Sequence, residues 1–175
     1  MLGSLDVTKI HWANCPNAWK GHLQGKEGYP KIVLEAVADY NLWVNQQFVN
    51  WLSPKSDELL YAEVPSSFST IMKTLDHIWS TEEYWFSVIS GIPMTEKESF
   101  DNLSKEEIFT GLLNSSTKLK HLINSMSEED LVNEVKITNP WFECELPVSD
   151  YLLQVINHGT YHRGQIVTMG RNIGI

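Results

Sequence analysis

The sequence of 175 residues lacks the features of several large classes of proteins. No apolar run approaches the roughly 18 to 20 residues needed to cross a bilayer, and no signal-peptide pattern opens the chain. Lys and Arg form no cluster and the formal net charge is −9, so binding to a nucleic-acid backbone is not expected. We therefore expect a cytoplasmic protein with neither a membrane nor a nucleic acid as partner.

Cysteines and phosphate-binding loops are also scarce or absent. The two cysteines, Cys15 and Cys144, match no zinc-ribbon or CxxC spacing. Two reduced thiols are the preferred interpretation over a disulfide in a cytosolic protein. No glycine-rich loop of the kind that holds nucleotide phosphates occurs, so nucleotide use is not indicated.

The chain from Pro30 onward predicts four long helices. In the first, apolar residues recur at three- and four-residue steps up to Trp51, and Pro54 ends the pattern. The other three helices are predicted from their start and stop signals: Ser66 or Ser67 to Gly91, Asp101 or Ser104 (in a capping box with Glu107) to about Met126, and Pro147 to Asp150 through about Arg171.

Two segments do not fit the helical pattern. Residues 131–146 are rich in β-branched and aromatic residues around Thr138-Asn139-Pro140, which predicts a short irregular hairpin before the last helix. Residues 1–29 show no periodicity and form either an N-terminal arm packed by Trp12 and Trp19 or an extension. For residues 30–175 we predict an all-α domain, a four-helix bundle with one long connection.

The last predicted helix carries His158 and His162, four residues apart. Both fall on its apolar stripe, about 5 to 6 Å apart at Cβ, so two imidazoles can reach one metal ion there. A pair of hydrogen-bonded core histidines is the alternative. His77, at the edge of the apolar arc of the second helix, is a third candidate because bundle metal sites take ligands from facing helices; otherwise it is a surface-edge residue.

Three neutral histidines, with one coordination position left open, form a known catalytic arrangement for zinc and similar ions. We expect one divalent ion per chain, with Zn, Ni or Fe as candidates. Ligating imidazoles usually donate their second N–H to a neighbour, and the candidates for this role are Asp76, Tyr161 and Gln165.

Two charged residues fall within apolar helical arcs, Glu82 in the second helix and Arg163 in the last. A buried charge without a partner is expensive, so we hypothesise a structural ion pair that braces these two helices. The alternative is that each side chain extends along the surface to reach solvent.

Three segments of the chain resemble the DinB-like (DNA-damage-inducible, YfiT-like) metalloenzyme family. They are Tyr40-Asn41-Leu42-Trp43-Val44-Asn45, Leu75-Asp76-His77-Ile78 and the run from Asn157 to Ile166, NHGTYHRGQI. The resemblance implies an up-down-down-up four-helix bundle, a metal site at His77, His158 and His162, and a homodimer. Characterised relatives include thiol-dependent S-transferases and a maleylpyruvate isomerase, and the family name does not imply DNA binding.

We therefore hypothesise a metal-dependent transferase or hydrolase that acts on a small-molecule substrate. The ion would lower the pKa of a bound water or a substrate thiol toward about 7. A low-molecular-weight thiol is a candidate cofactor. Two alternatives remain: a non-catalytic bundle that binds a metal and a small ligand, and a metal-free helical interaction domain in which the histidines are core residues.

Overall fold

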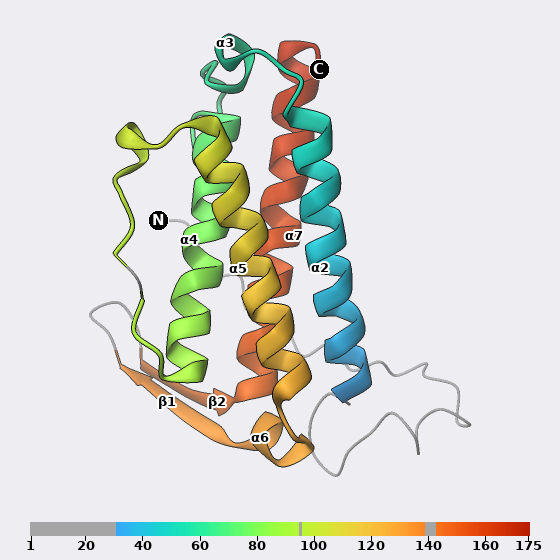
Figure 1. Cartoon of the computed structure of the whole chain (residues 1–175), viewed down its shortest axis with the longest axis vertical. Coiled ribbons are helices and arrows are strands. Elements are labelled where there is room, and N and C mark those ends of the chain that lie inside the picture. Colours follow the sequence, from blue (N-terminus) through green and yellow to red (C-terminus); the bar gives the residue numbers. More distant parts are fainter. Residues whose placement is uncertain (1–30, 95, 139–142) are drawn as a thin grey trace.

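The structure, a computed structural model, describes residues 31–94, 96–138 and 143–175. Its four long helices run side by side (Figure 1): α2 (Lys31–Leu52), α4 (Ile71–Ser90), α5 (Lys105–Ser125) and α7 (Val148–Ile173). α2 and α7 run in one direction and α4 and α5 in the other, which confirms the predicted up-down-down-up bundle. α2 and α4 occupy opposite corners, because each packs against both α5 and α7.

Short elements close the two ends of the bundle (Figure 1). At one end is α3 (Asp57–Leu60); at the other are α6 (Glu128–Val132) and a hairpin of β1 (Glu134–Thr138) and β2 (Glu143–Pro147). A 3-10 turn, η1 (Phe100–Asn102), lies in the connection between α4 and α5. The predicted hairpin is therefore present, with Ile137 opposite Cys144. Its tip and residues 1–29 lie outside the described residues.

The helix ends follow local sequence signals with one exception. Gly91 ends α4 in the left-handed conformation (φ 71°), and Ser104 and Glu107 form both bonds of the predicted capping box. The predicted start of α4 at Ser66 or Ser67 is wrong. Thr70 caps this helix, with its side chain accepting a hydrogen bond from the Lys73 N–H (3.0 Å). In the described parts of the chain, no helix is long and apolar enough to cross a membrane.

The interior of the bundle contains two apolar clusters with buried polar residues between them. The cluster nearer α3 includes Leu52, Leu75, Ile78, Leu112 and Ile166, and the cluster nearer the hairpin includes Leu34, Ala38, Leu119, Ile123 and Leu152. Between the two clusters, each long helix contributes at least one buried polar side chain. These side chains are Asn41, Asn45, Glu82, Ser115, Ser116 and Arg163. We call these six residues the polar layer.

Candidate metal centre

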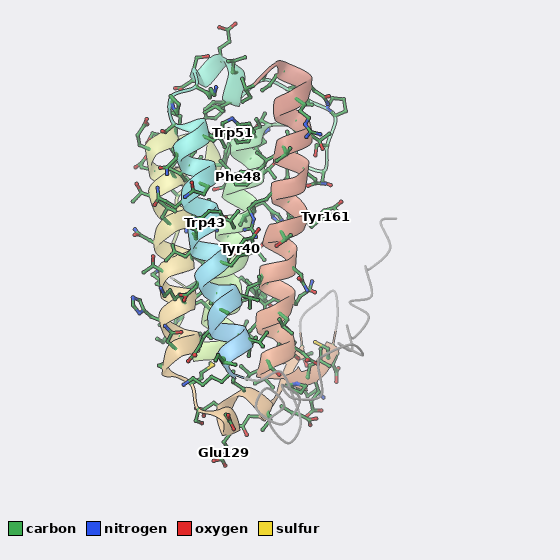
Figure 2. All side chains as sticks on the ribbon, turned by 90° about the vertical axis from the view of Figure 1, so that its right-hand side faces the viewer. Tyr40, Trp43, Phe48, Trp51, Glu129 and Tyr161 are labelled. Atoms are coloured by element: carbon green, nitrogen blue, oxygen red, sulfur yellow. The ribbon has the colours of Figure 1, made fainter. Side chains whose placement is uncertain are left out.

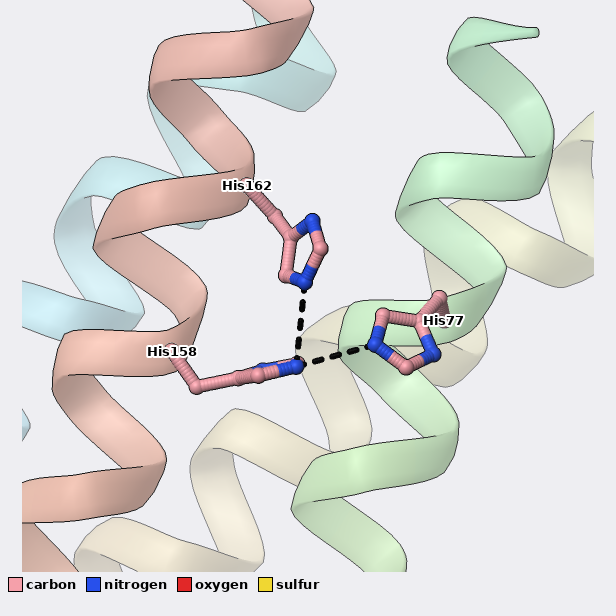
Figure 3. Close-up of side chains that lie close together, drawn as sticks. All are labelled: His77, His158 and His162. Carbon is pink, nitrogen blue, oxygen red and sulfur yellow. Dashed lines mark hydrogen bonds between the residues drawn. The ribbon is translucent and has the colours of Figure 1, made fainter. Parts of the chain in front are cut away.

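The three predicted histidines lie together between two neighbouring helices (Figure 3). His77 extends from α4, and His158 and His162 extend from successive turns of α7. The Nε2 atom of His158 lies 2.9 Å from Nε2 of His77 and 3.1 Å from Nε2 of His162. An imidazole nitrogen of α4 therefore meets, at one point, two of α7 that are distant from it in sequence.

Gln165 determines which nitrogen of His162 faces this point. Its Oε1 lies 2.7 Å from Nδ1 of His162, and its Nε2 donates to Oγ of Ser67 (2.9 Å) and to Oη of Tyr161 (3.1 Å). Because an amide oxygen can only accept, Nδ1 of His162 carries the proton and Nε2 of the neutral ring presents its lone pair to the cluster.

Burial keeps the cluster neutral. Desolvation, followed by the charge of His162, lowers the pKa of His77 to about 4. Desolvation and then the other two histidines lower the pKa of His158 to about 3, and desolvation also lowers the pKa of His162. All three rings are therefore uncharged at neutral pH, the state in which imidazole binds a metal ion.

The donor set fits a divalent metal ion. The three ligand atoms all lie within 4.8 Å of one another. Two nitrogens on one tetrahedral zinc ion lie about 3.3 Å apart, so little movement of the rings is needed. Nε2 of His162 can only accept a hydrogen bond. A single proton on Nε2 of His158 cannot bond fully to both His77 and His162, whereas one shared cation binds the lone pairs of all three rings.

Aromatic rings and a small pocket adjoin the cluster. The ring of Phe68 lies 4.2 Å from that of His77 and 5.6 Å from that of His162, centroid to centroid. A pocket of about 340 Å³ opens beside Gln165 and Tyr161, and its lining contains no charged side chain: Pro65, Ser66, Tyr161, Gly164, Gln165, Thr168 and Met169. None of the three histidines lines this pocket, which is linked to the cluster through Gln165. Its uncharged lining suits an uncharged organic group.

Asp76 does not hold a histidine, contrary to expectation. Its carboxylate accepts a hydrogen bond from the ammonium group of Lys97, which also donates to Oγ of Ser80 (2.6 Å). Lys97 lies over the ring of Trp79 as well, 4.0 Å from the centroid. Asp76 therefore acts on His77 only through its charge, which raises the pKa of that histidine against the larger lowering effect of burial.

Glu82 and Arg163 are both buried, with 2% and 4% of their surface exposed, but they do not pair directly as predicted. Two asparagines of α2 lie between them. Oε1 of Glu82 accepts from Nδ2 of Asn41 (2.8 Å) and of Asn45 (3.3 Å), and Nη1 of Arg163 donates to Oδ1 of both (2.9 Å each). The direct ion pair is thus replaced by an amide-bridged one.

The serines of α5 complete the polar layer. Oγ of Ser115 and of Ser116 lie 2.7 and 2.8 Å from Oε2 of Glu82. Burial raises the pKa of Glu82, opposed by the hydrogen bonds and by the charge of Arg163. Gly159 gives the guanidinium its space, since a Cβ there would lie 3.0 Å from Nη1 of Arg163.

Sequence reasoning identified the three histidines but not the role of the polar layer or of Phe68. A signal for the asparagines does exist: Asn41 and Asn45 are four residues apart and continue the buried stripe of Leu34 and Ala38 along α2. Polar residues within an apolar arc mark positions that must find partners across the core. Phe68 lies in the segment before α4 and has no comparable periodic signal.

The fold and this cluster together define an up-down-down-up helical bundle with a three-histidine site that could hold a metal ion. Comparison with known proteins names the family: a sequence model of the DinB family matches residues 25–175, and the chain belongs to this family. It is 30% identical to the protein DinB of Bacillus subtilis (strain 168) over 143 residues, which cover 78% of this chain and 83% of that protein.

A solved structure shows the same fold. The crystal structure of a DinB-like protein from Bacillus cereus ATCC 10987 matches with a TM-score of 0.63 and 23% sequence identity. The match covers 81% of this chain and 91% of the other. The predicted resemblance to the DinB-like family is thus confirmed.

Proposed function

We propose that this chain is a divalent-metal-dependent enzyme of the DinB family that transfers a thiol or hydrolyses a small, largely uncharged substrate. The observation that carries the proposal is the convergence of three imidazole Nε2 atoms, those of His77, His158 and His162. Structural zinc sites are normally closed by four protein ligands, whereas catalytic sites use three. Among the described residues, the cluster supplies three.

The residues of the chain have separate tasks in this proposal. His77, His158 and His162 would hold the ion, and Gln165 keeps the ring of His162 in the tautomer that binds it. A divalent ion in this position supplies a lowered pKa for a thiol or a water and so creates a nucleophile near neutral pH. Zn, Ni and Fe all accept such a ligand set.

The surroundings favour a thiol over a water as the reacting group. Asp76, the carboxylate next to His77 in sequence, is held by Lys97 and is not placed to accept a proton from a reacting water. A thiol with a lowered pKa needs no separate base. Tyr161 accepts a hydrogen bond from Gln165, which leaves its own hydroxyl proton for an acceptor atom on a substrate in the adjoining pocket.

The first test is the metal content of protein purified without an affinity tag. We expect about one ion per chain in the wild type and almost none in His158→Ala, because two imidazoles do not retain the ion. His121→Ala is the matched control, since His121 is an exposed histidine of α5. A wild type without metal, even after incubation with Zn or Ni, would reject the proposal.

The second test is turnover, screened with thiol-transfer and hydrolysis substrates. Replacing any one of the three histidines should abolish the activity that the screen finds, and His121→Ala should keep it. Full activity in His162→Ala would reject catalysis at this site. Bound metal without turnover would instead support a bundle that only binds a metal and a small ligand.

A further inference from the structure

The polar layer is an expensive feature for a bundle core. Glu82 and Arg163 are almost fully buried, and burying charges costs more than the pair regains unless every polar atom is satisfied. Apolar residues of similar volume at such positions are often neutral for stability or stabilising. Stability alone therefore does not explain why the layer interrupts an otherwise continuous apolar core.

The layer lies at the same height along the bundle as the histidine cluster. Arg163 directly follows His162 on α7, and Glu82 follows His77 on α4 by five residues, a little more than one turn. On α7 the two kinds of residue interleave: His158 and His162 face α4, whereas Gly159 and Arg163 face the amides of α2. Each helix that carries a histidine, α4 or α7, therefore also contributes a hydrogen-bonded residue of the polar layer close to that histidine.

The bridge between Glu82 and Arg163 passes through α2, which carries no histidine of the cluster. Asn41 donates to Glu82 of α4 and accepts from Arg163 of α7, and Asn45 does the same. Asn45 also donates to Oγ of Ser116 on α5 (2.8 Å). A shift of α7 along its axis, or a rotation about it, would break the two bonds from Arg163 to these asparagines. These bonds therefore set the position of α7 relative to α4, and with it the distance from His77 to His158 and His162.

We propose that Asn41 and Asn45 are positioning residues of the metal centre: they bridge Glu82 and Arg163 and so hold α4 and α7 at the separation at which the three histidines bind one ion. This inference rests on the proposed metal binding and adds residues that touch neither the ion nor a ligand of it. It also assigns a role to the asparagines of the first-helix segment.

Cobalt(II) binding tests the inference in the full-length protein, because Co²⁺ occupies zinc-type sites and its visible absorption reports ligand geometry. Asn41→Leu and Asn45→Leu keep the number and branching of the side-chain heavy atoms and remove the bridge. We expect each to lower Co²⁺ affinity about tenfold or more and to change the visible spectrum. Affinity is measured at a temperature at which each variant is folded by circular dichroism.

Leu119→Ala is the control for a purely structural effect. Leu119 is fully buried in the apolar cluster nearer the hairpin, so this variant loses stability without touching the polar layer. It should keep the wild-type affinity and spectrum. Where a leucine variant does not fold, Asn41→Ser or Asn45→Ser replaces it, with the same direction of change expected.

The possible failures are distinguishable. A wild type that binds no Co²⁺ would reject the proposed metal site, and the positioning role with it. A wild type that binds Co²⁺, together with folded asparagine variants of unchanged affinity and spectrum, would overturn the positioning role alone. An equal loss of affinity in Leu119→Ala would likewise overturn it, because general destabilisation would then explain the effect.

Discussion

At the scale of single residues, the side chain of Gln165 orients the ring of His162. Its amide oxygen fixes the proton on Nδ1, and its amide nitrogen is itself held by Ser67 and Tyr161. Such a chain of hydrogen bonds orients a ligand and raises its basicity without touching the ion.

Gln165→Leu should therefore lower metal affinity about 10- to 100-fold, because the ring of His162 loses its orienting acceptor. Affinity is measured by competition with a chelator of known metal affinity. Gln46→Leu is the matched control, since among the described residues Gln46 makes only an exposed side-chain hydrogen bond to Asn50 on the same helix. Wild-type affinity in Gln165→Leu would show that the ring needs no such acceptor.

The pH dependence of stability follows from the lowered pKa values of the histidines. A histidine in the unfolded chain has a pKa of about 6.5, whereas in the folded protein burial lowers the pKa of His77 to about 4 and the pKa of His158 to about 3. At a pH between the folded and the unfolded pKa of these histidines, the unfolded state binds more protons than the folded state. In the metal-free protein, the contribution of these uncharged histidines to the free energy of unfolding is therefore complete above the unfolded pKa. It is lost as the pH falls through and below that value.

Urea unfolding of chelator-treated protein at about pH 7.5 and about pH 5 measures this loss. His158→Phe removes one site at which the unfolded chain takes up a proton, so its stability should fall less between the two pH values than that of the wild type. The same fall in both proteins would contradict the assignment of a neutral, buried His158.

At the scale of helices, a close approach of backbone and side chain sets the packing of α4 against α5. Gly111 of α5 faces the indole of Trp79 on α4, and a Cβ at this position would lie 2.3 Å from the ring. In the parts of the chain that the structure describes, by contrast, a Cβ at Gly164 of α7 would have no neighbouring group within 4 Å. Two helical glycines thus occupy opposite steric environments.

Gly111→Ala should destabilise the protein by about 1–3 kcal/mol, because Trp79 must move within a packed interface. Gly164→Ala should be neutral or stabilising by up to about 1 kcal/mol, since alanine favours the helix and meets open space. Urea unfolding of the two variants measures both values. Stabilisation by both substitutions would show that the indole of Trp79 moves aside without cost.

At the scale of the whole molecule, one side of α2 has the composition of an interface. Ile32, Tyr40 and Trp43 are 58%, 49% and 58% exposed, and Tyr40 and Trp43 appear along α2 in Figure 2. Residues 40–52 contain no charged side chain, although the chain carries a net charge of −9. Two copies of an acidic chain repel each other least where their surfaces carry no charge, as along residues 40–52. Exposed Tyr and Trp are also typical of interfaces.

We therefore propose a homodimer in which the exposed side of α2 contacts the same side of a second copy. Trp43→Glu should convert the dimer to a monomer, because it places two like charges in the contact. Light scattering after size-exclusion chromatography measures the mass. Ile92→Glu is the control, since Ile92 is 56% exposed just beyond α4 and should leave the dimer intact. A monomeric wild type, or a dimeric Trp43→Glu, would reject the interface.

The sequence by itself determined the long helices, most of their ends and the pair His158 and His162, which His77 joins only because α4 packs against α7. Periodicity, the Ser104–Glu107 capping box and the stop at Gly91 all act within a few residues, so no distant part of the chain can change them. The four-residue step from His158 to His162 is local in the same sense. The start of α4 differed, because Thr70, and not a serine of the preceding segment, caps that helix. The short helices α3 and α6 were not predicted.

Only the tertiary structure decided the partners of the charged residues. Apolar arcs placed Glu82 and Arg163 inside the bundle, but the arcs do not show that the amides of Asn41 and Asn45 lie between them. Asp76 likewise pairs with Lys97, which lies in the connection between α4 and α5. The partner of a buried polar group depends on which helix packs at which rotation, and the sum of all contacts in the core sets that rotation.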